Sequence, residues 1–197
     1  MKKICFLICI FASTLVNAQE KIVVKETFEN NKFQWSEFYE KDQSGGIEAE
    51  YFVLKNKTKK NPALSKAELP ITIGENFKIT FKFLVPKISG DYYFGIIFNY
   101  KSNKNYDKFL VTERKFQILN DDDDIVDRGM LILKSGKNKE VSIEIEKKGT
   151  KLIFRVDDIE AATITGEINS NSFGFMVEGK NTIRVNEVII EQRAAEE

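Results

Sequence analysis

The sequence predicts an all-β protein folded as a two-sheet antiparallel β-sandwich of the jelly-roll type. Between residues 22 and 190, apolar and polar residues alternate in most segments, which is typical of strands with one buried face. Glycine, asparagine, aspartate and serine interrupt these segments about every 8 to 15 residues, a spacing that suits antiparallel strands joined by turns. About a dozen strands in one domain require two stacked sheets or a barrel, because a single open sheet would leave an apolar face in water.

The alternation is clearest in three segments, residues 77–85, 141–146 and 152–157, where every second residue is apolar. In residues 183–190 the apolar residues change phase across Asn186 and Glu187, which predicts a β-bulge there. Asp157 and Asp158 separate two strand-like segments, so we expect them to close a hairpin, although aspartate adopts positive φ less easily than Asn-Gly.

Residues 92–100, YYFGIIFNY, are apolar in both phases. Such a segment is expected of a central strand of a curved sheet that has the core on one side and a groove on the other. We assign the larger set to the core: Tyr92, Phe94, Ile96, Phe98 and Tyr100. The outward set is then Tyr93, Gly95, Ile97 and Asn99, with Gly95 leaving room between its neighbours.

The N-terminus has the layout of a secretory signal peptide. Lys2 and Lys3 precede an apolar run from Ile4 to Val16, and Val16-Asn17-Ala18 offers compact residues for cleavage before Gln19. An N-terminal membrane anchor is the alternative, but about 13 residues are too few to span a bilayer comfortably. We expect a signal peptide (residues 1–18), one sandwich domain (19–191) and a short tail (192–197), in a secreted or periplasmic protein with no later membrane span.

Composition excludes several classes of function. Both cysteines, Cys5 and Cys9, lie in the predicted leader, so the mature chain has no disulfide. The sequence has no histidine, which excludes Ser-His-Asp and Cys-His catalysis and histidine-based zinc sites. Loss of the two leader lysines leaves 28 basic and 30 acidic residues, a net charge of −2, which argues against nucleic-acid binding.

The order of several motifs resembles the concanavalin A-like lectin/glucanase superfamily, in its laminin-G-like and 3-keto-disaccharide hydrolase-like bacterial branches. The resemblance covers nearly all of residues 22–191, and its motifs are KETFENNKFQWSEF, FKITFKFLV, YYFGIIFNYKSNKNYDKFLV, KEVSIEIEKKGTKLIFRVDDIE and FGFMVEGKNTIRVNEVII. It implies a sandwich with a concave sheet on which ligands bind. The pair Asp157-Asp158 departs from the Asn-Gly turn that related modules commonly have.

The outward side of the YYFGIIFNY strand is the candidate binding surface. Sugars stack on aromatic rings and form hydrogen bonds with amide, carboxylate and hydroxyl groups. The candidate ligand-binding residues are Tyr93, Ile97, Asn99, Tyr106 and Arg114, with Asp107 beside them. The alternative is that a loop such as residues 55–70 covers Tyr93 and Ile97. Trp35, the single tryptophan, is expected in the core.

Two charged runs have a functional and a simpler interpretation. Asp121, Asp122, Asp123 and Asp124 supply the carboxylate oxygens that calcium prefers, and the resemblance implies calcium on rim loops in many relatives, but a solvated hairpin tip is the simpler interpretation. Residues 55–60, KNKTKK, are expected to form a basic loop on the solvated surface. Binding of an anionic polymer is the alternative interpretation of this loop.

Carboxylate pairs are the remaining route to catalysis. Glu144 with Glu146, and Glu48 with Glu50, lie on one face of their predicted strands, but neither pair completes the Glu-hydrophobic-Asp-x-x-Glu pattern of the superfamily's glucanases. We therefore predict a non-catalytic binding module for a glycan or another extended surface polymer on the concave sheet. A protein–protein or cell-envelope assembly module is the alternative, and a divergent glycoside hydrolase the third.

Overall fold

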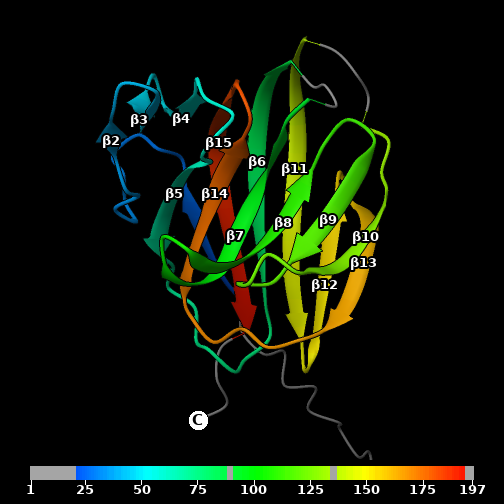
Figure 1. Ribbon diagram of the computed structural model, residues 1–197. Coiled ribbons are helices and arrows are strands. Elements are labelled where there is room, and N and C mark those ends of the chain that lie inside the picture. Colours follow the sequence, from blue (N-terminus) through cyan, green and yellow to red (C-terminus); the bar gives the residue numbers. More distant parts are fainter. Residues whose placement is uncertain (1–20, 88–90, 134–136, 194–197) are drawn as a thin grey trace, which may run out of the picture.

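Two antiparallel sheets face each other in the computed structural model, which describes residues 21–87, 91–133 and 137–193. The nine-stranded sheet has the order β13-β12-β11-β6-β15-β4-β3-β2, with β1 also paired to β15, and the six-stranded sheet has the order β10-β9-β8-β7-β14-β5. In Figure 1 the six-stranded sheet lies in front. Within these ranges no helix is long and apolar enough to cross a membrane. The predicted all-β sandwich is confirmed.

The strands follow the chain in this order: β1 (Lys21–Glu26), β2 (Phe38–Tyr39), β3 (Gln43–Glu48), β4 (Tyr51–Asn56), β5 (Ala63–Glu68), β6 (Phe77–Lys87), β7 (Tyr93–Ser102), β8 (Asn105–Val111), β9 (Lys115–Leu119), β10 (Ile125–Met130), β11 (Lys137–Lys148), β12 (Lys151–Val156), β13 (Ile159–Thr165), β14 (Ser172–Glu178) and β15 (Asn181–Arg193). Neighbours in sequence often lie in different sheets, so the core unites segments far apart along the chain.

The core lies between the sheets and consists of the apolar residues that the alternation placed on one face. In β6 the buried residues are Phe77, Ile79, Phe81, Phe83 and Val85. Trp35, in the connection between β1 and β2, is 1% exposed, and its ring centroid lies 4.9 Å from that of Phe175 on β14 of the six-stranded sheet. The prediction that Trp35 belongs to the core is confirmed.

Strand β7 carries most of the YYFGIIFNY segment and lies between β14 and β8, inside the six-stranded sheet. Tyr92, Phe94, Ile96 and Phe98 belong to the core, as predicted. The assignment of Tyr100 to the core is wrong. Asn99 adopts φ +51°, the β7–β8 register shifts between Phe98 and Ser102, and Tyr100 packs on the outer face instead.

Two further local predictions hold. The β15 register against β6 shifts between Val185 and Glu187, which is the predicted bulge. Asp157 and Asp158 connect β12 to β13 with φ values of +49° and +64°, as a two-residue hairpin with both central residues left-handed requires.

The predicted start of the tail at residue 192 is wrong. Strand β15 continues to Arg193, and the side-chain amide of Gln192 donates to the carbonyl oxygen of Thr72 at 3.2 Å and accepts from the Thr72 N–H at 3.0 Å. These two bonds anchor the end of β15 to the loop before β6. The predicted signal peptide lies outside the described residues.

Candidate functional site

The outer face of the six-stranded sheet carries a second, smaller apolar cluster. Its buried members are Ile97, Tyr106, Leu110, Leu119 and Met176, and the half-buried Leu64, Tyr93 and Tyr100 pack against them. These residues come from β5, β7, β8, β9 and β14 and share one face because they occupy matching register positions, such as Met176 opposite both Leu64 and Gly95. The segment YYFGIIFNY is therefore apolar in both phases because both of its faces are packed.

Ile97 is 0% exposed and packs within this apolar cluster. Residues 63–68 of the proposed covering loop form β5, an edge strand of the same sheet, so that alternative is wrong for these residues. The side chain of Ile97 packs over Gly174 of the neighbouring strand, where an added Cβ atom would lie 2.8 Å from it. Larger side chains on the same face enclose it.

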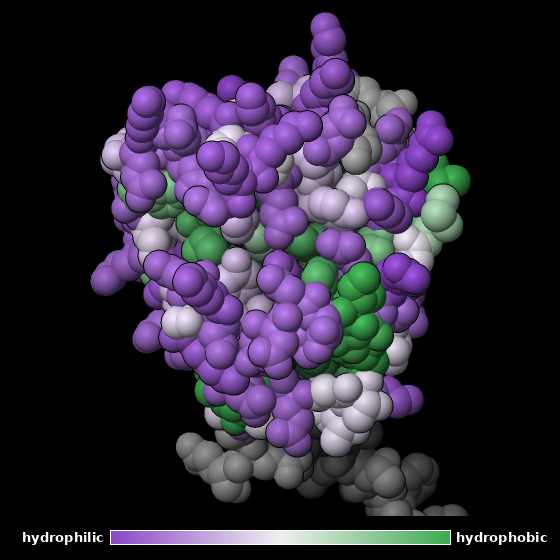
Figure 2. Space-filling view, in the orientation of Figure 1, coloured by the Kyte–Doolittle hydropathy of each residue, from purple (hydrophilic) through white to green (hydrophobic). Residues whose placement is uncertain are grey.

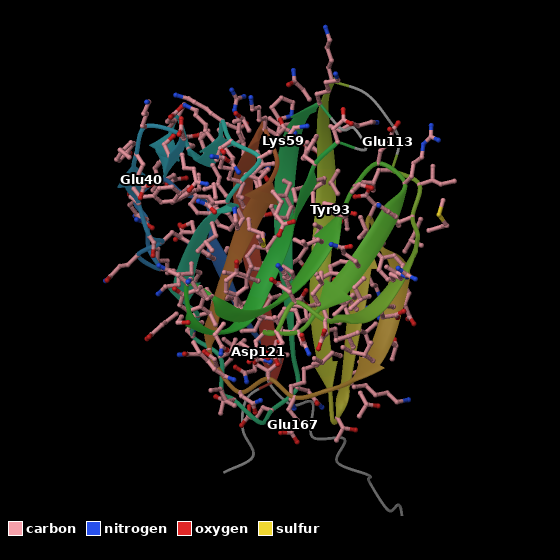
Figure 3. All side chains as sticks on the ribbon, in the orientation of Figure 1. Glu40, Lys59, Tyr93, Glu113, Asp121 and Glu167 are labelled. Carbon is pink, nitrogen blue, oxygen red and sulfur yellow. The ribbon has the colours of Figure 1, made fainter. Side chains whose placement is uncertain are left out.

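A groove of about 800 Å³ lies beside this cluster. Its lining includes apolar and aromatic side chains (Phe38, Leu64, Tyr106), amides (Gln43, Asn61, Asn103), lysines (Lys66, Lys104, Lys108) and acids (Glu40, Asp121, Asp123, Glu178). Figure 2 shows this side of the molecule as mainly hydrophilic, with hydrophobic residues across its middle. In Figure 3, Glu40 lies at the β2 side, Asp121 towards the lower end of the sheet and Tyr93 near its centre. A groove of this size with a few polar groups around an apolar floor suits a small ligand or a short segment of polymer.

Lys108 lies within this groove and is 7% exposed. Its ammonium group is 2.6 Å from a carboxylate oxygen of Asp123 and 3.4 Å from one of Glu178. Burial lowers the pKa of Lys108, but the hydrogen bond to Asp123 and the charge of Glu178 outweigh it, so the pKa is raised overall. Lys108 therefore stays charged and ties the loop after β9 to the end of β14.

Three lysines lie over tyrosine rings on this face. The ammonium groups are 4.7 Å (Lys66 over Tyr100), 5.7 Å (Lys108 over Tyr106) and 5.3 Å (Lys115 over Tyr93) from the ring centroids. Tyr100 and Tyr106 also stack on each other, with centroids 5.9 Å apart and planes 13° apart. Burial raises the pKa of both hydroxyl groups, so the two rings remain neutral near pH 7.

The structure brings together three of the five predicted ligand-binding residues. Tyr106 lines the groove, and Tyr93 and Ile97 belong to the apolar cluster beside it. Ile97 is 0% exposed, so the prediction that it contacts a ligand is wrong and it supports the surface from beneath. The other two lie elsewhere. Arg114 is exposed in the turn between β8 and β9, where its carbonyl oxygen accepts the N–H of Leu131 at 2.9 Å.

Asn99 is 7% exposed and its side chain is used within the protein, contrary to the outward position predicted for it. Its amide nitrogen donates to Asp107 at 2.7 Å and to the carbonyl oxygen of Glu167 at 3.0 Å, and its amide oxygen accepts the N–H of Asn169 at 2.8 Å. The left-handed conformation at Asn99 turns the side chain away from the groove. Asn99 therefore fixes the connection between β13 and β14.

Sequence reasoning missed Lys66, Lys108 and Glu178. A signal was present for Lys108, because Tyr106, Lys108 and Leu110 alternate and must share one face of their strand. Lys66 could not be placed without the pairing of β5 with β14, which puts it opposite Gly174.

The acidic run does not gather into a metal site in the described part of the chain, where no group of three or more acidic residues is placed to hold an ion. Asp121 pairs with Lys101 at 3.2 Å and Asp123 pairs with Lys108. Asn120 shapes this loop, since its side-chain oxygen accepts the N–H groups of Asp122 and Asp124 at 3.1 and 2.9 Å. The loop therefore serves as a wall of the groove.

Glu144 and Glu146 lie on the outer face of the nine-stranded sheet, far from this groove in the topology. Both accept from the same nitrogen of Arg155, at 2.5 and 2.7 Å, and Glu144 also pairs with Lys78 at 3.5 Å. Burial raises the pKa of Glu146. Hydrogen bonds from Lys148 and Arg155 lower this pKa by more than burial raises it, so the net shift is downward. Glu146 is therefore held ionised, which is unsuitable for a general acid. Glu48 and Glu50 do not share a strand, because β3 ends at Glu48.

No protein-family model matches the sequence, and no curated protein is significantly similar to it. Solved structures do match in fold. A sialidase matches with a TM-score of 0.59 and 12% identity over 79% of this chain, which spans 16% of the sialidase. A Bacillus subtilis protein of unknown function with a galectin-like fold matches with a TM-score of 0.62 and 10% identity, over 87% of this chain and 96% of that one.

The carbohydrate-binding module CBM66 from Bacillus subtilis matches with a TM-score of 0.52 and 12% identity, over 81% of this chain and 92% of that one. The similar structures thus include an enzyme and a binding module, so the fold does not decide between catalysis and binding. At these identities the matches establish the fold: the chain is a galectin-like, concanavalin A-like jelly-roll sandwich, as the sequence resemblance implied.

Proposed function

We propose that this protein is an exported, non-catalytic module that binds a glycan in the groove on the outer face of its six-stranded sheet. The observation that carries this proposal is the groove itself, in which aromatic, amide and charged side chains surround an apolar floor. Aromatic rings contact the C–H faces of sugars, while amides and charged groups bind hydroxyl groups. The similarity to a carbohydrate-binding module supports the same class of ligand.

The non-catalytic role is supported by the available side chains. The chain has no histidine, and the paired acids Glu144 and Glu146 are neutralised by Arg155 on the opposite side of the sandwich. Of the four acids that line the groove, Asp123 and Glu178 are engaged by Lys108, and Asp121 pairs with Lys101. Binding therefore accounts for these groups without a role for an acid–base pair.

A glycan array tests the proposal, with Leu64→Arg as the groove-blocking variant. Leu64 is half-buried on β5 and lines the groove, so a longer charged side chain there occupies the space of a ligand. We expect the unmodified protein to bind at least one glycan and Leu64→Arg to lose that binding, while an exposed tyrosine outside the groove, changed by Tyr39→Ser, has no effect. Circular dichroism of each variant shows whether it folds. Absence of any glycan bound by the unmodified protein contradicts the proposal.

Export is tested separately. The signal-peptide pattern of residues 1–18 supports it. Mass spectrometry of the mature protein from its native cell should give an N-terminus at Gln19. A mature chain that still starts at Met1 contradicts export by cleavage.

A further inference from the structure

We propose that the groove selects an acidic glycan, whose sugar carboxylate binds the ammonium group of Lys66. This inference rests on the proposed glycan-binding function and adds the chemical class of the ligand. It starts from the four-membered stack of Lys66, Tyr100, Tyr106 and Lys108, in which two tyrosine rings stack on each other and each ring also contacts one lysine.

The two lysines of the stack differ in their counter-ions. Lys108 is neutralised by Asp123 and Glu178. Lys66 is half-buried and lines the groove, yet within residues 21–87, 91–133 and 137–193 no carboxylate oxygen lies within ion-pair distance of it. A cation over a ring keeps a place for an anion, because the ring replaces only part of its hydration. Lys66 is therefore positioned for a ligand's negative charge.

Contact with the ring of Tyr100 holds the Lys66 ammonium over the sheet at 4.7 Å from the centroid. A lysine otherwise loses side-chain entropy when it binds an anion, and a side chain that is already held loses less. The hydroxyl group of Tyr100 donates to the side-chain oxygen of Asn103, and this hydrogen bond fixes the ring. Asn103 also lines the groove. Lys104 follows directly and, with Lys66 and Lys108, is one of three lysines in the lining.

The acidic wall of the groove gives the ligand a direction. Asp121 and Asp123 belong to the loop after β9, whereas Lys66 lies on β5 at the other edge of the sheet. Asp121 and Asp123 are paired with Lys101 and Lys108, so that side offers a ligand carboxylate no free cation, whereas Lys66 has no carboxylate partner among the described residues and attracts it. A uronic acid or another carboxylate-bearing sugar, bound with its acid group at Lys66, satisfies both conditions.

Calorimetric titration of the purified protein tests this inference with polygalacturonate and alginate as acidic probes and dextran and galactan as neutral ones. We expect an acidic probe to bind more tightly than either neutral one, with an affinity that falls as ionic strength rises. Lys66→Gln removes one charge-assisted hydrogen bond and should weaken that binding by about tenfold. The matched control is Lys115→Gln, which removes a lysine of the same face that also covers a tyrosine but does not line the groove, and should change the affinity less than about twofold.

The outcomes separate this inference from the function on which it rests. Tight binding of a neutral probe that Lys66→Gln leaves unchanged overturns the acidic-glycan inference and retains the groove as a glycan site. Equal losses in Lys66→Gln and Lys115→Gln also overturn it, because the effect then comes from net charge. Absence of binding by all four probes and by a wider glycan array overturns both.

Discussion

The side-chain amide of Asn99 donates a hydrogen bond of 2.7 Å to the carboxylate of Asp107 on the neighbouring strand β8. This bond only partly offsets the cost of placing Asp107 in its half-buried position. Burial raises the pKa of Asp107, the hydrogen bond from Asn99 lowers it, and the negative charge of Asp121 raises it again, with a net shift upward. Because the pKa of Asp107 is higher in the folded than in the unfolded protein, its ionisation disfavours folding.

The first prediction concerns Asp107→Asn. The stability linked to Asp107 is fully present below the unfolded pKa and is lost as the pH rises through the raised folded pKa. Asparagine does not ionise, so the variant should be more stable than the unmodified protein near neutral pH. The expected gain is less than about 1 kcal/mol, because the site is half-exposed and screened. Thermal melts between about pH 4 and pH 8 should show the gain shrinking as the pH falls. The exposed Asp122→Asn is the control, and a gain of the same size there would refute the assignment to Asp107.

Glu187 should show the opposite pH dependence. A hydrogen bond from Lys82 lowers the pKa of Glu187, burial opposes this, and the charges of Lys82 and Lys25 lower it further, with a net shift downward. The stability that Glu187 contributes is therefore present above its unfolded pKa and lost as the pH falls through the depressed folded value. Glu187→Gln should cost about 1 kcal/mol near neutral pH and much less in acid. Denaturant titrations at two pH values measure this, and a cost independent of pH would mean that packing is responsible.

Gly95→Ala should be strongly destabilising. A Cβ atom at residue 95 would clash with the carbonyl oxygen of Phe109 and lie 3.0 Å from the Cα of Leu110, both in the backbone of the paired strand β8. The space that the sequence suggested beside Gly95 is thus occupied by this backbone. We expect a cost of about 2 kcal/mol or more, measured by chemical denaturation. Gly166→Ala is the control, because the nearest atoms to its Cβ belong to flexible side chains, Leu152 at 3.2 Å and Ile164 at 4.0 Å, and equal costs for both would contradict the explanation.

Asp158→Gly should stabilise the hairpin between β12 and β13. Asp158 is exposed at φ +64°, a conformation that glycine adopts more readily than aspartate. The expected gain is about 0.5 kcal/mol in the free energy of unfolding, because the greater flexibility of the unfolded glycine offsets part of the relief. Asp157→Gly is the matched comparison. Its carboxylate accepts the N–H of Ser142 at 2.8 Å, so that variant should lose stability even though φ is also positive there.

The sequence predicted the sandwich, the β15 bulge and the Asp157-Asp158 hairpin, because each depends on local periodicity or turn chemistry. It placed Phe94, Ile96 and Phe98 correctly for the same reason. It misplaced Tyr100, because the left-handed residue that reverses the phase is Asn99, which looks like any polar residue of a strand.

The groove was harder to predict than the fold, because its composition depends on strand order. Lys66 lies on β5 and Tyr100 on β7, and only β14 lies between these two strands in the sheet. The two side chains meet because of this strand order. Phe38 joins them from the edge of the other sheet. No periodicity within a strand contains this information.

The position of the bound glycan is read directly from a map of the amide chemical-shift changes caused by a glycan selected on the array. We predict that the changes concentrate on Leu64 and Lys66 of β5, Tyr106 and Lys108 of β8 and the loop at residues 121–123. Changes concentrated on the outer face of the nine-stranded sheet, around Glu144 and Arg155, would contradict it.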